Sequence, residues 1–178
     1  MTIFPKGRFK MYSIGDVVTY AASGVCKVSG YTENKVKGVV KKYVVLTPFY
    51  ESNSTIYVPQ DNEVLMGRIK NVLTKEDIDT LIRSMPDIDC SWIDNDLKRA
   101  DYFRTTLKSG DREAIMRMVR VLYVHRKSQI ESGKKFHSSD ERYLKEAEHI
   151  LFDEFAVVLG IEPDEVVDFI TERLEKIS

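Results

Sequence analysis

The sequence has only two cysteines, no long apolar run and almost no net charge, and each of these absences excludes a class of protein. Cys26 and Cys90 lie far apart and belong to no CxxC motif, so we expect neither a disulfide framework nor a structural zinc site. No run of about 18 apolar residues is present, so we expect no membrane span. The first residues lack the apolar core of a signal peptide, which indicates a cytoplasmic protein.

The motifs of common catalytic and cofactor sites are missing as well. The sequence contains no GxSxG elbow, no P-loop, no GxGxxG turn and no HExxH pair. His125, His137 and His149 stand in no metal-ligand spacing. The acidic residues between positions 87 and 96 lack the glycine and the terminal glutamate of a calcium loop. We therefore expect no enzyme, no metal site and no cofactor.

The formal net charge of −1 hides segments of opposite sign. Residues 1–72 carry 10 basic and 5 acidic side chains, and residues 98–135 carry 11 basic and 4 acidic ones. Residues 73–97 and 136–178 are acidic in balance. Because salt screens charges over about 8–10 Å, a locally basic surface attracts an anion whatever the overall charge. Residues 98–135 are thus where we expect a polyanion, the alternative being that these charges only form solvated helix faces.

Residues 11–72 show the composition and turn chemistry of short β-strands. The runs rich in Val, Tyr, Thr and Ile are separated by turn-forming Gly, Asn, Ser and Pro. Four or five short strands in about 60 residues predict a small antiparallel barrel of the Tudor-like, or SH3-like, type. Pro59 ends its strand or places it at an edge, because proline cannot donate to a ladder. The expected strands are Asp16–Tyr20, Gly24–Tyr31, Tyr43–Tyr50 and Thr55–Val58.

From Thr74 onward the apolar spacing becomes helical. Thr74 with Asp77 predicts an N-cap, and Ser138 with Glu141 predicts a capping box. The expected helices are Lys75–Met85, Trp92–Lys108, a third from Asp111 to Gly133, a fourth from Ser138 to Leu159 and a last one over Asp164–Lys176. The predicted fold class is α+β. It consists of a leader (1–10), the β domain (11–72) and an all-helical bundle (73–178).

Short motifs follow one another in a fixed order through both parts. In the β part they are Ile14–Val18, Gly24-Val25, Lys37-Gly38, Tyr43–Leu46 and Val58-Pro59. In the helical part they are Trp92, Leu107, Ser109–Asp111, Glu141–Leu144, Ala147 and Ile150-Leu151. This series resembles the CarD/CdnL family of bacterial transcription regulators, whose β module also occurs in transcription-repair coupling factors. The resemblance covers about residues 11–160.

The resemblance implies a regulator that is not an enzyme and that sits as a monomer on RNA polymerase. In this family the Tudor-like domain binds the polymerase β subunit. The helical domain contacts promoter DNA just upstream of the −10 element, where a tryptophan wedges into the minor groove and stabilises the open complex. Carried over to this chain, the polymerase contact falls on Thr55, Ile56, Tyr57 and Val58, and the wedge falls on Trp92.

Basic residues near the tryptophan are expected to hold DNA phosphates. Arg99 follows Trp92 by about two helical turns, which would place it near the indole. Phosphate contacts position a protein without reading sequence, so we expect weak, largely non-sequence-specific DNA binding. The expected DNA contacts besides Trp92 are Lys98, Arg99, Arg117, Arg120 and Lys127.

The residues alone leave two questions and one rival function open. Trp92 is either an anchor buried against the bundle or an exposed wedge. Ile56 and Val58 either only face the barrel core, or also belong to an edge strand that accepts a partner strand through its backbone. The rival function is a polymerase-bound adaptor that recruits proteins and barely touches DNA, which the acidic residues after Trp92 and the acidic segment 136–178 favour.

Overall fold

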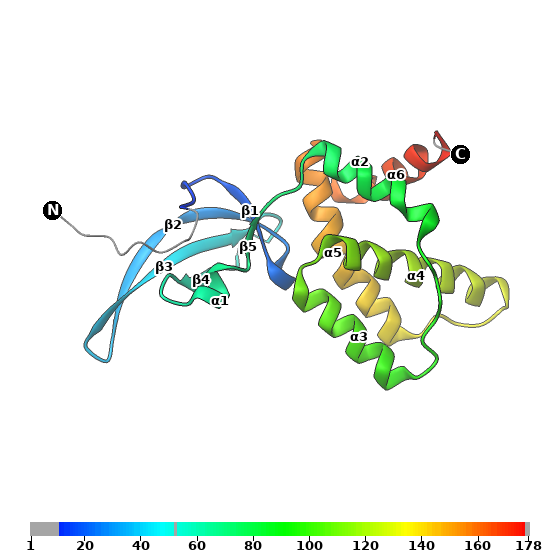
Figure 1. Cartoon of the computed structure of the whole chain (residues 1–178), viewed down its shortest axis with the longest axis horizontal. Helices are drawn as coiled ribbons and strands as arrows, with labels where there is room; N and C mark the ends of the chain where they lie inside the picture. Colours follow the sequence, from blue (N-terminus) through cyan, green and yellow to red (C-terminus); the bar gives the residue numbers. More distant parts are fainter. Residues whose placement is uncertain (1–10, 52, 177–178) are drawn as a thin grey trace.

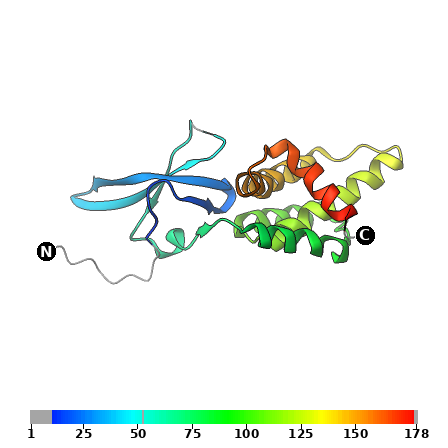
Figure 2. The same cartoon turned by 90° about the horizontal axis from the view of Figure 1, so that it is seen from above.

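The computed structural model describes residues 11–51 and 53–176 of the chain. A β-sheet body and a helical body lie end to end, so the molecule is elongated (Figures 1 and 2). The predicted leader, residues 1–10, lies outside the described residues.

The first body is a five-stranded antiparallel sheet, and the fold class predicted from the sequence is confirmed. The strand order is β4-β3-β2-β1-β5, so β4 and β5 form the two ends. Val18, Leu46 and Val58 are among the side chains that fill its core. The strands are β1 (Val17–Tyr20), β2 (Val25–Val36), β3 (Val39–Pro48), β4 (Ile56–Pro59) and β5 (Ile69–Asn71), with the short helix α1 (Glu63–Met66) between the last two.

Strands β2 and β3 are longer than the sequence predicted. After a register shift between Val28 and Gly30, their ladder continues to the pair Val36 and Val39. Lys37 and Gly38 turn the chain with φ of 50° and 84°, the two positive values that a tight two-residue hairpin requires. Because that turn matches the twist of the strands, the hairpin extends far beyond the sheet core (Figure 1).

The second body is a bundle of five helices. The predicted apolar stripe of Ile115, Met118, Val119 and Leu122 is buried in its core. The predicted N-cap at Thr74 is confirmed as a full capping box with Asp77. The helices are α2 (Lys75–Ser84), α3 (Asp96–Ser109), α4 (Arg112–Glu131), α5 (Ser138–Leu159) and α6 (Val166–Glu175), with the 3-10 turns η1 (Ala21–Ser23), η2 (Met85–Asp87) and η3 (Pro163–Glu165).

One predicted helix start and one predicted capping box are wrong. The helix α3 begins at Asp96 rather than at Trp92, because the Asn95 side chain accepts the Lys98 N–H and caps it there. Residues 88–95 are therefore a non-helical segment, and Trp92 lies within it. The capping box at Ser138 is not formed either. His137 is the N-cap of α5 and makes no side-chain capping bond, which puts Ser138 inside the helix.

A buried ion pair joins the two bodies. Glu154 of α5 is 1% exposed and accepts two hydrogen bonds from Arg112, at 3.0 and 3.1 Å. It also accepts the Leu73 backbone N–H at 2.8 Å. The same guanidinium donates to Thr19 Oγ1 of β1 and to the Asn71 carbonyl of β5, both at 2.8 Å. One charge pair therefore ties the sheet, the connecting segment and two helices together.

Two glycines let the bodies approach closely beside this pair. A Cβ on Gly24 would stand 3.5 Å from Ile150 Cα, and one on Gly110 would stand 3.6 Å from Ala21 Cα. Both glycines have positive φ, 65° and 62°, which other residues adopt only under strain. The orientation of the helical body is therefore set by direct backbone packing as well as by the ion pair.

Candidate functional site

The strand β4 forms an open edge of the sheet with a defined set of outward groups. The Gln60 N–H donates to the Lys42 carbonyl at 2.8 Å. Hydrogen-bonded pairs alternate along an antiparallel ladder, so Val58 and Ile56 also bond to β3 through their backbones. The backbone N–H and C=O of Tyr57, at the position between them, consequently point away from β3. Pro59, two residues after Tyr57, has the same backbone orientation. Its missing N–H would also point away from β3, so the ladder loses no hydrogen bond there.

The side chains of the four residues predicted to contact polymerase point in different directions. Val58 is fully buried and Ile56 is half-buried against the sheet core. Tyr57 is 56% exposed and meets Tyr43 edge-to-face, with ring centroids 6.4 Å apart. Thr55 is exposed and precedes the strand. Core packing and an available edge thus coexist in β4, because the first uses side chains and the second uses backbone.

Trp92 is half-buried and stacks on a histidine of α4. Its ring lies parallel to that of His125 on α4, with centroids 3.5 Å apart and an interplanar angle of 6°. The Arg99 guanidinium lies over the indole, 4.5 Å from its centroid, in cation–π geometry. Phe103 completes the contact at 6.5 Å. The indole is therefore partly buried: it packs against the core of the helical body and is held there by His125 and Arg99.

The structure corrects the expected role of Arg99. Its side chain is buried, and it forms a two-pronged pair with Asp140 of α5, at 3.0 and 3.1 Å. It also donates to the Ile93 carbonyl at 2.8 Å and to Asp96 at 2.8 Å. A guanidinium engaged in this way is not presented to a phosphate. Arg99 instead fixes the segment that carries Trp92, which makes it a positioning residue.

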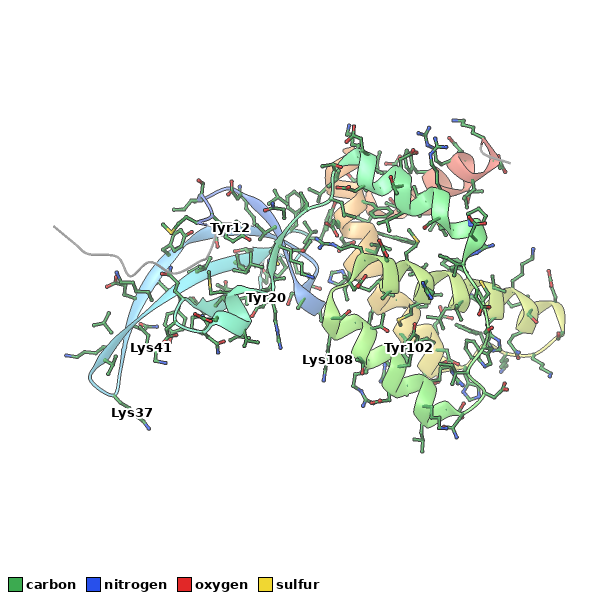
Figure 3. All side chains as sticks on the ribbon, viewed as in Figure 1. Tyr12, Tyr20, Lys37, Lys41, Tyr102 and Lys108 are labelled. Carbon is green, nitrogen blue, oxygen red and sulfur yellow. The ribbon has the colours of Figure 1, made fainter. Side chains whose placement is uncertain are left out.

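An open hollow of about 180 Å³ lies beside the indole. Arg117 and Val121 of α4 form one side, and Tyr102 of α3, labelled in Figure 3, forms another. Asp89 also lines it, and this carboxylate accepts hydrogen bonds from the Ser91 N–H and hydroxyl. The hollow thus combines an aromatic wall, one exposed arginine and one carboxylate whose oxygen is already engaged.

The other predicted DNA contacts are spread over two helices. Lys98 is exposed in the first turn of α3. Arg120 is half-buried, and its Nε has no hydrogen-bond partner within the described residues. Lys127 is exposed near the far end of α4, with its ammonium 3.9 Å from Glu131. Of the predicted cations, Arg99 and Arg117 meet at Trp92. The sequence did not reveal His125 or Asp140 as neighbours of that site.

Both bodies of the chain match known protein families. Residues 12–70 match the CarD-like/TRCF RID domain, and residues 88–171 match the CarD C-terminal domain. The chain belongs to the CarD-like family. It is accordingly a transcription regulator that interacts with RNA polymerase, built from domains that serve as non-enzymatic regulatory modules. Among curated proteins, none matches the chain closely enough to count as a relative.

Over residues 11–51 and 53–176, no helix combines the length and apolarity that a bilayer span demands. Within the same ranges, no group of three or more His, Cys, Asp or Glu side chains is arranged to hold a metal ion.

The stacked pair predicts a pH-dependent fluorescence from the only tryptophan. Burial lowers the pKa of His125 below its ordinary 6.5, and nearby Arg99 acts in the same direction against Asp140 and Asp94. Because the pKa of His125 is lowered in the folded protein, neutral His125 contributes its full share to the free energy of unfolding above pH 6.5. That contribution is lost as pH falls through the pKa of the folded protein. Because an imidazolium stacked on indole quenches its emission, Trp92 fluorescence should fall with a midpoint below pH 6.5. His125→Gln should abolish the transition; a midpoint above 6.5 would contradict this assignment.

Proposed function

We propose that this CarD-like protein binds the β subunit of RNA polymerase as a monomer, by pairing β4 with a strand of the polymerase. The observation that carries this half is the open edge of β4, where the backbone groups of Tyr57 point away from the sheet. Exposed strand edges accept partner strands through main-chain hydrogen bonds. The outward Tyr57 side chain adds contact area beside that edge.

The second half of the proposal is that Trp92 stabilises the promoter open complex from the minor groove upstream of the −10 element. An apolar or aromatic side chain that enters a base step costs a few kcal/mol of unstacking, which contacts to the distorted DNA offset. His125 and Arg99 hold the indole in a fixed orientation, so little further ordering is needed on binding. Arg117 lies beside it as a phosphate contact, with Lys98, Arg120 and Lys127 farther out, and no catalysis is involved.

The lifetime of the open complex with the cognate polymerase tests both halves. Trp92→Ala should shorten the lifetime by about 5–150-fold, since stacking on a base contributes roughly 1–3 kcal/mol. Tyr57→Pro removes one outward N–H without breaking a bond to β3, so it should weaken polymerase binding about tenfold. Tyr57→Val is the matched control, because it alters the side chain and keeps the backbone donor.

Each variant reports on a different half of the proposal. If Tyr57→Pro abolishes the effect and Trp92→Ala retains it, the protein is a polymerase-tethered adaptor, the function that its acidic segments favour. If Tyr57→Val weakens binding as much as Tyr57→Pro, the contact is made by side chains and strand pairing is wrong. A wild-type protein that leaves the lifetime unchanged rules out the open-complex function.

A further inference from the structure

Two basic residues, one on β5 and one in the turn before it, lie on the side of the sheet that meets the helical body. Lys70 is paired with Thr19 of β1, and opposite residues in an antiparallel pair place their side chains on the same face. The Thr19 hydroxyl accepts a hydrogen bond from Arg112 of α4, so this face meets the helical body. Arg68 lies in the turn just before β5, and it lines the same hollow as Lys70. Both cations are exposed, whereas Ile69 between them is buried in the sheet core.

The end of α3 reaches the same place. Arg68, Lys70, Ser109, Gly110 and Arg112 line one small hollow at the junction of the two bodies. Lys108 is the last basic residue of α3, and it is exposed directly before Ser109, which lines the hollow. Figure 3 shows Lys108 at the end of α3 that faces the sheet. The close approach of Gly110 to Ala21 holds this end of α3 against the sheet body.

These cations are not neutralised by neighbouring carboxylates. None of Arg68, Lys70 and Lys108 forms an ion pair with a residue in the described ranges 11–51 and 53–176. The buried carboxylate at the junction, Glu154, is already occupied by Arg112 and by the Leu73 N–H. Asp111 nearby caps α4 by accepting the Ala114 N–H. The junction therefore presents three positive charges from two bodies on one exposed surface.

We propose that Arg68, Lys70 and Lys108 form a second DNA-binding surface, which holds backbone phosphates of the duplex at the junction of the two bodies. Their charge and exposure suit a polyanion, and phosphate contacts of this kind need no base recognition. The inference rests on the proposed function, because it assumes that Trp92 engages the same DNA. It adds that the sheet body itself touches DNA.

The helix α3 sets the distance between the two contact points. The Trp92 indole contacts Phe103, in the middle of α3, and Lys108 lies in the last turn of that helix. Five helical residues separate Phe103 from Lys108, a rise of about 7.5 Å along the axis. A duplex that meets Trp92 and follows α3 toward the sheet therefore reaches the junction within a few base pairs.

The test compares the affinity of labelled full-length protein for polymerase alone with its affinity for polymerase holding a promoter duplex. The ratio of the two is the gain in affinity due to DNA. The triple variant Arg68→Gln, Lys70→Gln, Lys108→Gln should reduce this gain about tenfold and lower the salt slope by about 2–3. Its affinity for polymerase alone should stay unchanged.

A charge-matched control guards against an effect of net charge alone. Lys35→Gln, Lys37→Gln, Lys41→Gln removes three cations at the far end of the β2–β3 hairpin, where Figure 3 labels two of them. This variant should keep the gain. If it loses as much as the junction variant, binding follows overall charge and the surface is not a site.

The remaining outcomes separate this inference from the proposed function. If the junction variant keeps the wild-type gain while Trp92→Ala loses it, the second surface is wrong and the wedge stands. If the junction variant loses affinity for polymerase alone, the surface binds protein rather than DNA. If wild-type protein shows no gain, the DNA half of the proposed function fails together with this inference.

Discussion

Replacing Glu154 with alanine should lower the free energy of unfolding by about 3–5 kcal/mol, because it leaves the Arg112 charge unpaired inside the junction. The carboxylate is 1% exposed and accepts hydrogen bonds from Arg112 and from the Leu73 N–H. Removing it deprives all of these donors of a partner at once. Urea unfolding followed by circular dichroism measures the change.

Glu146→Ala is the matched control for Glu154→Ala. Glu146 lies on the same helix and pairs with Arg142 at 3.8 Å, but both side chains are more than half exposed. An exposed pair of this kind contributes less than about 1 kcal/mol. If the two variants were destabilised equally, the junction pair would have no special role. A separate early transition of the sheet body in Glu154→Ala would show that this pair couples the two bodies.

Asp140→Ala is the second change for which we expect a large effect, again about 3–5 kcal/mol. Asp140 is 3% exposed and accepts both prongs of the buried Arg99 guanidinium. Without it, Arg99 has no buried counter-charge and loses its fixed position over the indole. The Trp92 emission should therefore shift to longer wavelength, and the open complex should lose stability together with the protein.

Asp96→Ala separates these effects, because it removes the other carboxylate that pairs with Arg99. Asp96 is 75% exposed at its side chain, so its loss should cost less than about 1 kcal/mol and leave the Trp92 emission unchanged. Equal spectral shifts in the two variants would contradict the view that Asp140 fixes the arginine. An unshifted emission in Asp140→Ala would show that His125 alone orients the indole.

Local features of the fold were predictable from the sequence where neighbouring residues decide them. The N-cap at Thr74 and the glycine stops at Gly110 and Gly160 involve residues within one turn of each other, and all three are as predicted. Pro59 predicted either the end of a strand or an edge strand, because proline is tolerated where no partner strand needs its N–H, and β4 both ends at Pro59 and lies at the edge. Strand β5 was not identified, because three residues are too few to show an alternating pattern.

The start of α3 shows why a local reading failed at the site itself. The apolar spacing predicted a helix that starts at Trp92. The Asn95 side chain caps the helix, however, so α3 starts at Asp96. Arg99 nevertheless meets Trp92, because the non-helical segment folds back over the helix and its Ile93 carbonyl accepts a bond from that arginine. The expected neighbour was right and the geometry behind it was wrong.

By itself, the sequence determined the β-then-helical order, the periodicity of the core, the charge segments and the family. Tertiary structure alone decided which charges remain available to a partner. Arg99 and Asp140 are 41 residues apart, as are Asn71 and Arg112, and neither pairing leaves a local pattern in the chain. The packing of α3 against α5 buries Arg99 in an ion pair with Asp140. The contact between the two bodies, in contrast, leaves Arg68, Lys70 and Lys108 exposed. Periodicity reports which face of an element is buried, but only the assembled fold determines which faces meet.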